Sequence, residues 1–142
     1  MIMKTEIRPF HLAIPVNNLD VAKKFYIDIL GSKVGRFTNT WVDLNFFGHQ
    51  LVLHLTDIKQ DTDFNFVDNK KIQIPHFGVI LNWKDWINLS EKIKDKIDFI
   101  IEPYVRFKGQ TGEQATMFFL DKDNNALEFK AFKNDSMIFE KY

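Results

Sequence analysis

The sequence predicts an α+β fold built from two tandem β-α-β-β-β modules. The stretch RPFHLAIPVNN at residues 8–18 returns in altered form as QIPHFGVILNW at 73–83, and each copy carries one histidine at the same place. Each copy is followed by an apolar helical stripe and then by three strand-like runs. One module exposes an apolar sheet face that it cannot cover alone, so we expect the two copies to pack as a single domain with a shared cleft.

The first module is expected over about residues 6–57. It begins with the strand-like run FHLAIPV, which ends at the turn and helix-cap signal NN. An amphipathic helix of about three turns should follow, because an apolar stripe at helical spacing stops at Gly31. The residues of this stripe are Val21, Ala22, Phe25, Tyr26, Ile29 and Leu30. Three strand-like runs complete the module: KVGRFT, WVDLNFF and QLVLHLTD.

The second module, over about residues 74–133, repeats this order. The strand HFGVIL leads into a helix that opens at Asn82 and has an apolar face, and the strands DFIIEP, QATMFFLD and ALEFKAF follow. That face consists of Trp86, Leu89, Ile93 and Ile97. Aligning His11 with His76 also aligns Asn17 with Asn82 and Asp20 with Asp85, which is a helix-capping pattern. The polar segment 58–73 is expected to be a linker, and 134–142 a C-terminal tail.

Composition narrows the classes of function. Lys and Arg number 19 and so do Asp and Glu, so no broad field attracts nucleic acid or anionic lipid, and we expect a small-molecule substrate. The absence of Cys excludes disulfides, thiolate zinc sites and a cysteine nucleophile. No apolar run resembles a signal peptide or a membrane span, which predicts a cytoplasmic protein without a membrane partner. The 15 Phe residues suit a thick core or an apolar cavity.

The stretches FHLAIPVNNLDVAKKFYIDILG, PHFGVIL and FFLDKDNNALEFKAF together resemble the vicinal oxygen chelate superfamily. This superfamily includes glyoxalase I, fosfomycin and bleomycin resistance proteins, and extradiol dioxygenases. The resemblance covers about residues 8–132, and it implies that a curved eight-stranded mixed sheet, with the helices outside, forms a cup around a divalent metal ion. By the same resemblance the metal ligands are His11, His76 and Glu128, and Val52 stands where glyoxalase-type members have a further acid.

Strand alternation supports the same three ligands. His11 shares a face with Ala13, His76 with Gly78, and Glu128 with Ala126, so each side chain has a small neighbour that leaves room for a ligand. A single His on an apolar strand is more often a satisfied core residue than a ligand, and Glu128 with Lys130 also fits the solvated edge of a strand. Two imidazoles and one carboxylate suit Fe(II), which we favour, and equally accept Mn(II), Ni(II) or Zn(II).

The absence of an acid at Val52 argues against glyoxalase chemistry and favours a dioxygenase-like reaction. The spacing of His11, His76 and Glu128 along the chain is similar to that in the catalytic half of extradiol dioxygenases, although Phe119 stands where their catalytic tyrosine is expected. Two alternatives stay open. One is a lyase or a thiol or water transferase similar to fosfomycin-resistance enzymes, and the other is a metal-free, dimeric drug-binding protein similar to bleomycin-resistance proteins.

Three further residues are candidates for the site. His54 lies two residues after Val52, so it shares the face of Val52 and would suit proton transfer; an edge histidine facing water is the alternative. Tyr104 and Arg106 lie in the stretch EPYVRFKGQTGEQ, which reads as a loop over the cleft that binds an anionic or polar substrate group, or as a plain solvated connection. Members of the superfamily also exchange modules between chains, so the predicted partners include a homodimer.

Overall fold

The computed structural model describes residues 6–59 and 61–141. The chain divides after Ile58 into two compact units, which we call the N-terminal unit and the C-terminal unit. Position 60 of the expected linker and position 142 of the expected tail lie outside the described residues. Among the described residues, no helix is long and apolar enough to cross a membrane.

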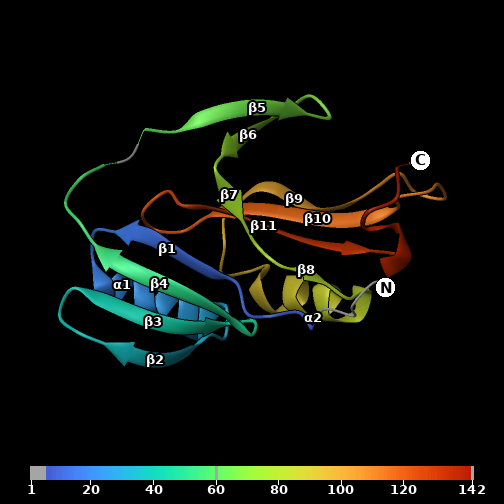
Figure 1. Cartoon of the computed structure of the whole chain (residues 1–142). Coiled ribbons are helices and arrows are strands. Elements are labelled where there is room, and N and C mark those ends of the chain that lie inside the picture. Colours follow the sequence, from blue (N-terminus) through green and yellow to red (C-terminus); the bar gives the residue numbers. More distant parts are fainter. Residues whose placement is uncertain (1–5, 60, 142) are drawn as a thin grey trace. The chain divides into compact units, whose positions relative to one another are not determined.

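The N-terminal unit has the predicted β-α-β-β-β order. Its strands are β1 (His11–Val16), β2 (Lys33–Phe37), β3 (Trp41–Phe46) and β4 (His49–Leu55). They form one sheet in the order β1-β4-β3-β2, in which β1 and β4 run parallel and the other pairs are antiparallel. The helix α1 (Leu19–Lys23) continues as a π-helical segment (Lys24–Ile29) along one face of this sheet (Figure 1).

The start of this first helix differs from the prediction. The N-cap is Asn18, whose side chain accepts a hydrogen bond from the Val21 amide at 3.0 Å. Asn17, which the repeat alignment placed at the helix start, instead donates from Nδ2 to the Thr56 carbonyl at 2.6 Å. Asn17 therefore connects the end of β1 to the end of β4, and the cap lies one residue further along the chain.

The C-terminal unit repeats the same strand order. It contains β7 (His76–Phe77), β8 (Ile80–Leu81), α2 (Trp83–Ile93), β9 (Phe99–Arg106), β10 (Gln114–Leu120) and β11 (Ala126–Phe132). The sheet order is β7-β11-β10-β9, and β8 also pairs with β11, so the predicted strand HFGVIL is one edge strand interrupted at Gly78 and Val79. A short 3-10 helix (Asp135–Met137) lies in the expected tail.

Helix α2 is fixed to the sheet that carries Glu128. Asn82 caps it as predicted, accepting from the Asp85 amide at 2.8 Å and donating to the Asp85 carboxylate at 2.9 Å. Trp86, Leu89 and Ile93 form its buried face, whereas Ile97 lies beyond the end of the helix. The buried Trp86 indole donates to the Phe129 carbonyl at 2.9 Å, which ties the helix to β11 at the residue that follows Glu128.

The expected linker contains an antiparallel hairpin that the sequence analysis did not predict. Its strands are β5 (Asp63–Val67) and β6 (Lys70–Ile74), and they form a separate two-stranded sheet (Figure 1). Ile72 of β6 is buried in a small cluster with Ile101, Phe118 and Ala126. The polar composition of the segment concealed this hairpin, because most of its side chains face solvent.

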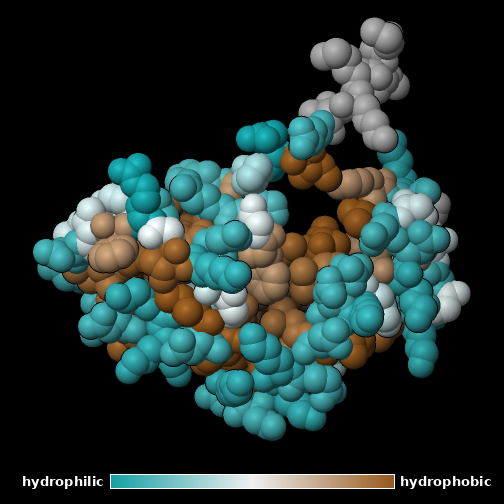
Figure 2. All heavy atoms as spheres, turned by 90° about the horizontal axis from the view of Figure 1, so that it is seen from below, coloured by the Kyte–Doolittle hydropathy of each residue, from teal (hydrophilic) through white to brown (hydrophobic). Residues whose placement is uncertain are grey.

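The aromatic residues divide between core and surface. Tyr26, Phe118, Phe119 and Phe129 are among the largest fully buried side chains, as expected for a thick core. Phe10, Phe37, Phe64, Phe66, Phe107 and Phe139 are exposed. Figure 2 shows apolar side chains between the polar ones on one face of the molecule. The aromatic content therefore does not by itself indicate a cavity.

Candidate metal and substrate site

His76 and Glu128 come together in the C-terminal unit. His76 begins the edge strand β7 and pairs with Ala126, two residues before Glu128 on β11. His76 Nε2 lies 3.3 Å from Glu128 Oε2, and both side chains are largely shielded, with 29% and 14% of their surface exposed. The predicted small neighbour of Glu128, Ala126, is buried at this point. Two of the three predicted ligands therefore lie side by side in this unit.

The environment of His76 fixes its tautomer. Its Nδ1 lies 2.8 Å from the Gln73 carbonyl oxygen, and since a carbonyl can only accept, Nδ1 must carry a proton. The other ring nitrogen, Nε2, is then the one directed at Glu128. A backbone carbonyl that orients the ring in this way is typical of metal-binding histidines. Phe118 packs edge-on against the ring at a centroid distance of 5.2 Å.

Glu128 has two further partners. Thr116 on β10 donates from Oγ1 to Glu128 Oε1 at 3.1 Å. The Lys130 ammonium lies 3.4 Å from the same oxygen. Oε1 is therefore engaged by a hydroxyl and an ammonium, while Oε2 faces the imidazole. The alternation Thr116, Phe118 on β10 predicts this shared face, but the sequence analysis did not single out Thr116.

A pocket of about 160 Å³ opens above this group of residues. His76, Thr116, Phe118, Glu128 and Lys130 line it together with Tyr104, Arg106, Ile101 and two hairpin residues, Val67 and Ile72. Tyr104 and Arg106 belong to strand β9, so their expected placement in a loop over the cleft was wrong. The strand continues past Pro103, where we expected it to end, and the loop begins only at Phe107.

The structure also corrects the position of the aromatic residue at the site. Phe119, which we expected in place of a catalytic tyrosine, is fully buried on the opposite face of β10 and stacks on Phe129 with a centroid distance of 5.9 Å. Its neighbour Phe118 lines the pocket and contacts His76. Side-chain alternation explains the difference, since consecutive strand residues point to opposite faces.

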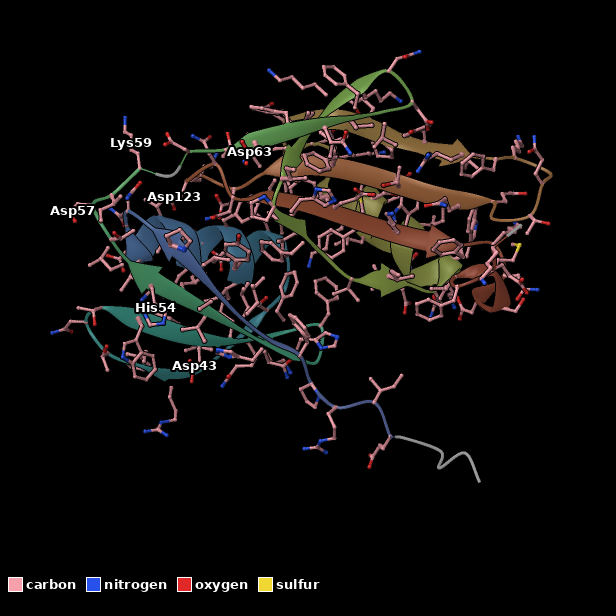
Figure 3. All side chains as sticks on the ribbon, turned by 45° about the horizontal axis from the view of Figure 1, so that its top comes forward. Asp43, His54, Asp57, Lys59, Asp63 and Asp123 are labelled. Carbon is pink, nitrogen blue, oxygen red and sulfur yellow. The ribbon has the colours of Figure 1, made fainter. Side chains whose placement is uncertain are left out.

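His11 and His54 lie in the N-terminal unit. His11 Nδ1 lies 2.8 Å from the Gln50 side-chain oxygen, which again leaves Nε2 as the free ring nitrogen. His54 is exposed and shares the face of Val52 and His11, as the register of β1 with β4 shows. Asp43 of β3, which Figure 3 labels, is an acid that the sequence analysis did not single out. It pairs with Val52 on the neighbouring strand β4.

A complete set of ligands is not found among the residues that the structure describes. No group of three or more His, Cys, Asp or Glu side chains there is arranged to hold a metal ion. The pair His76 and Glu128 does fit a divalent ion, because one free imidazole nitrogen and one carboxylate oxygen face each other. A metal at this pair would need at least one more protein ligand from elsewhere.

Comparisons with known proteins agree with the repeated topology. A crystal structure of a glyoxalase/bleomycin resistance protein/dioxygenase from Alicyclobacillus acidocaldarius is 36% identical, with a TM-score of 0.79 over 96% of this chain and 100% of that chain. A fosfomycin resistance protein from Listeria monocytogenes, at 17% identity, gives a TM-score of 0.66 over 96% of this chain and 100% of that chain. A lactoylglutathione lyase from Agrobacterium tumefaciens, at 14% identity, gives a TM-score of 0.62 over 90% of this chain and 96% of that chain.

The last two similarities concern the fold alone. No curated protein matches the sequence significantly. Residues 8–129, however, match the family described as the glyoxalase/bleomycin resistance protein/dioxygenase superfamily. The resemblance identified from the sequence is thereby confirmed, and the chain belongs to this superfamily.

Proposed function

We propose that this protein is a metal-dependent enzyme that acts on a small oxygenated organic molecule, with His76, Glu128 and His11 as the metal ligands. The observation that carries the proposal is the approach of His76 Nε2 to Glu128 Oε2 at 3.3 Å. Because Nδ1 carries the proton, Nε2 of a neutral ring presents a lone pair to a carboxylate oxygen. These two atoms repel each other unless a cation or a proton lies between them.

His11 is the proposed third ligand. It occupies the position in the first repeat that His76 occupies in the second, and its free nitrogen is also Nε2. We also propose that two modules pair to form one eight-stranded cup. The two modules belong either to one chain or to two chains of a homodimer. Three protein ligands leave coordination positions open for substrate, which is the arrangement of catalytic rather than structural sites.

When bound, a divalent ion such as Fe(II), Mn(II), Ni(II) or Zn(II) polarises substrate oxygens and stabilises developing negative charge. Thr116 and Lys130 hold one oxygen of Glu128, so the other oxygen keeps its direction toward His76. Phe118 and Ile101 limit the access of water to the pocket. Tyr104 and Arg106 are the proposed substrate contacts, and His54 the proposed proton carrier.

For the reaction we propose dioxygenase-like chemistry, because Val52 provides no acid at the position used in glyoxalase-type proton transfer. A lyase or a thiol or water transferase of the fosfomycin-resistance type is the alternative within the same metal site. Oxygen uptake separates the two, since a dioxygenase consumes oxygen in proportion to product and a lyase or transferase does not.

Metal analysis of protein purified without an affinity tag tests the ligands. We expect about one divalent ion per chain in the wild type. His76→Ala, Glu128→Gln and His11→Ala should each lose it. His54→Gln and Glu102→Gln are matched controls, because His54 is not a proposed ligand and Glu102 is an exposed residue of β9. Unchanged metal content in the three ligand variants would refute the proposed site.

A metal-free binding protein is a second candidate, and one observation favours it. The Lys130 ammonium at 3.4 Å from Glu128 Oε1 offers the carboxylate a positive partner without any metal. Such a protein would bind no metal even after reconstitution, and it would bind aromatic ligands equally well in the presence of a chelator.

A further inference from the structure

The tip of the β5–β6 hairpin carries a carboxylate that binds two pocket residues. Asp68 and Asn69 form the two-residue turn between the paired residues Val67 and Lys70, and both have positive φ angles, of 50° and 61°. Arg106 donates to Asp68 from Nε at 2.6 Å and from Nη2 at 3.3 Å. The Tyr104 hydroxyl donates to the same carboxylate at 3.2 Å.

These contacts define a binding site for a planar anion, which we call the carboxylate site. The guanidinium reaches both oxygens of Asp68, which is the side-on geometry that arginine uses for carboxylates. The Lys70 ammonium lies 3.6 Å from the centre of the Tyr104 ring and adds positive charge nearby. Hydrogen bonding to Arg106 lowers the pKa of Asp68, so this carboxylate is charged at neutral pH.

The Arg106 side chain requires an acceptor at this place. Only 16% of its surface is exposed, whereas 43% of the Asp68 side chain is. A largely desolvated guanidinium without a partner is unfavourable, but the partner need not belong to the protein. Another carboxylate in the same place would satisfy Arg106 and Tyr104 equally well.

The carboxylate site belongs to the pocket that contains His76 and Glu128. Tyr104 and Arg106 line this pocket, and so does Val67, the residue before Asp68. Its volume of about 160 Å³ is close to that of an engineered cavity of about 150 Å³ that binds benzene. Small-molecule sites are usually larger, on the order of 300–1,000 Å³, as expected if the hairpin tip covers part of the pocket.

The hairpin is anchored at its base and much less at its tip. At the base, Ile72 and Gln73 are buried, and Gln73 donates from its side chain to the Asn124 carbonyl at 2.7 Å. At the tip, Asp68 and Asn69 are exposed, and Asp68 is held by its polar contacts with Tyr104 and Arg106. Since an isolated pair of strands is only marginally stable, the tip can move while the base stays in place.

We propose that the substrate bears a carboxylate group that binds Arg106 and Tyr104 in place of Asp68, so that Asp68 is a built-in competitor that opposes ligands without such a group. No covalent bond changes in this exchange, because one carboxylate replaces another on the same donors. Asp68 therefore determines specificity, since only an anion that binds Arg106 better than Asp68 does opens the pocket fully. The inference rests on the proposed function for the identity of this pocket as the substrate site.

Titration of the full-length protein with benzoate tests the competition directly, with binding measured by calorimetry. We expect Asp68→Asn to bind benzoate about tenfold more tightly than the wild type does. This change corresponds to a rise, from about a tenth of the molecules to nearly all, in the fraction whose Arg106 is free of residue 68. Arg106→Gln, alone or combined with Asp68→Asn, should abolish binding. Benzamide, which has the same ring without the charge, cannot pair with the Arg106 guanidinium and should bind both proteins much more weakly than benzoate binds Asp68→Asn.

Equal or weaker benzoate binding in Asp68→Asn, with circular dichroism unchanged, would overturn the proposal and make Asp68 a residue that positions Arg106. Tighter binding of methylphosphonate than of benzoate would overturn the carboxylate assignment. Titrations with and without a chelator separate this inference from the proposed function. If the wild type binds no metal even after reconstitution, while Asp68→Asn still binds benzoate more tightly, the metal site is refuted and the carboxylate site stands.

Discussion

The two units orient equivalent histidines by different means. In the N-terminal unit, His11 donates to a side-chain amide, that of the exposed Gln50, at 2.8 Å. In the C-terminal unit, the half-buried His76 donates to the Gln73 backbone carbonyl at 2.8 Å and also faces Glu128. A backbone acceptor in an anchored strand loses little entropy when it orients the ring, whereas a mobile glutamine must be ordered first. The C-terminal unit therefore holds its histidine in the more preorganised way.

The residue two positions after each histidine sharpens this comparison. The N-terminal unit has Ala13, and the C-terminal unit has Gly78, where a Cβ atom would lie 1.6 Å from the Glu128 carbonyl oxygen. This contact is with backbone, so no side-chain rotation can relieve it. The backbone at Gly78 thus approaches the backbone of β11 closely, and this approach places the edge strand beside Glu128.

Gly78→Ala is expected to have the largest effect, a loss of about 3 kcal/mol in the free energy of unfolding, because the edge strand must move away from β11. Urea denaturation measures it. The matched change Ala13→Gly in the other unit should cost only about 0.5–1 kcal/mol, through backbone entropy. Similar losses in both variants would show that the approach at Gly78 does not constrain the edge strand.

Gln50→Ala is expected to have an intermediate effect, on the metal and not on the fold. Without the amide, the His11 ring turns freely, and we expect metal affinity to fall about tenfold. Competition with a chelator of known affinity measures it, and Gln110→Ala at an exposed loop position is the control. An unchanged affinity in Gln50→Ala would mean that His11 is not a ligand or that Gln50 does not orient it.

Much of this arrangement could be predicted because it follows from local pattern and repetition. Side-chain alternation placed Glu128 on the face of Lys130, the repeat made His76 equivalent to His11, and the family resemblance assigned His76 and Glu128 to one site. Phe119 was assigned from the family resemblance alone, and the alternation of side chains along β10 places Phe118 at the pocket instead. The cap at Asn18 was missed because the repeat aligns Asn17 with Asn82, and only Asn17 is followed three residues later by an acid. The contact of Asn17 with Thr56 instead leaves Asn18 as the cap.

The hairpin and its contacts could not be predicted in this way. The segment 58–73 is polar, so it resembles a linker in composition, yet Ile72 finds a buried cluster and Asp68 finds Arg106. The residues that contact Ile72 and Asp68 are distant from the hairpin in sequence. The repeated pattern of the two modules contains no counterpart of the hairpin. Tyr104 and Arg106 were chosen for their chemistry, but the acceptor that defines their geometry lies in the segment that showed no pattern.

The smallest expected effect is a local titration that only the C-terminal unit should show. Arg106 and, less strongly, Tyr104 lower the pKa of Asp68 from its ordinary value of 3.8. A carboxyl group whose folded-state pKa is lowered stabilises the fold above its unfolded pKa, and this contribution disappears as the pH falls through the folded-state pKa. The hairpin tip should therefore stay closed at pH 4–5 and open only at a pH below about 3.8. Carbon NMR of the Asp68 carboxyl group measures the midpoint, and Arg106→Gln should return it toward 3.8. A midpoint that is the same in both proteins would mean that the guanidinium does not bind the hairpin tip in solution.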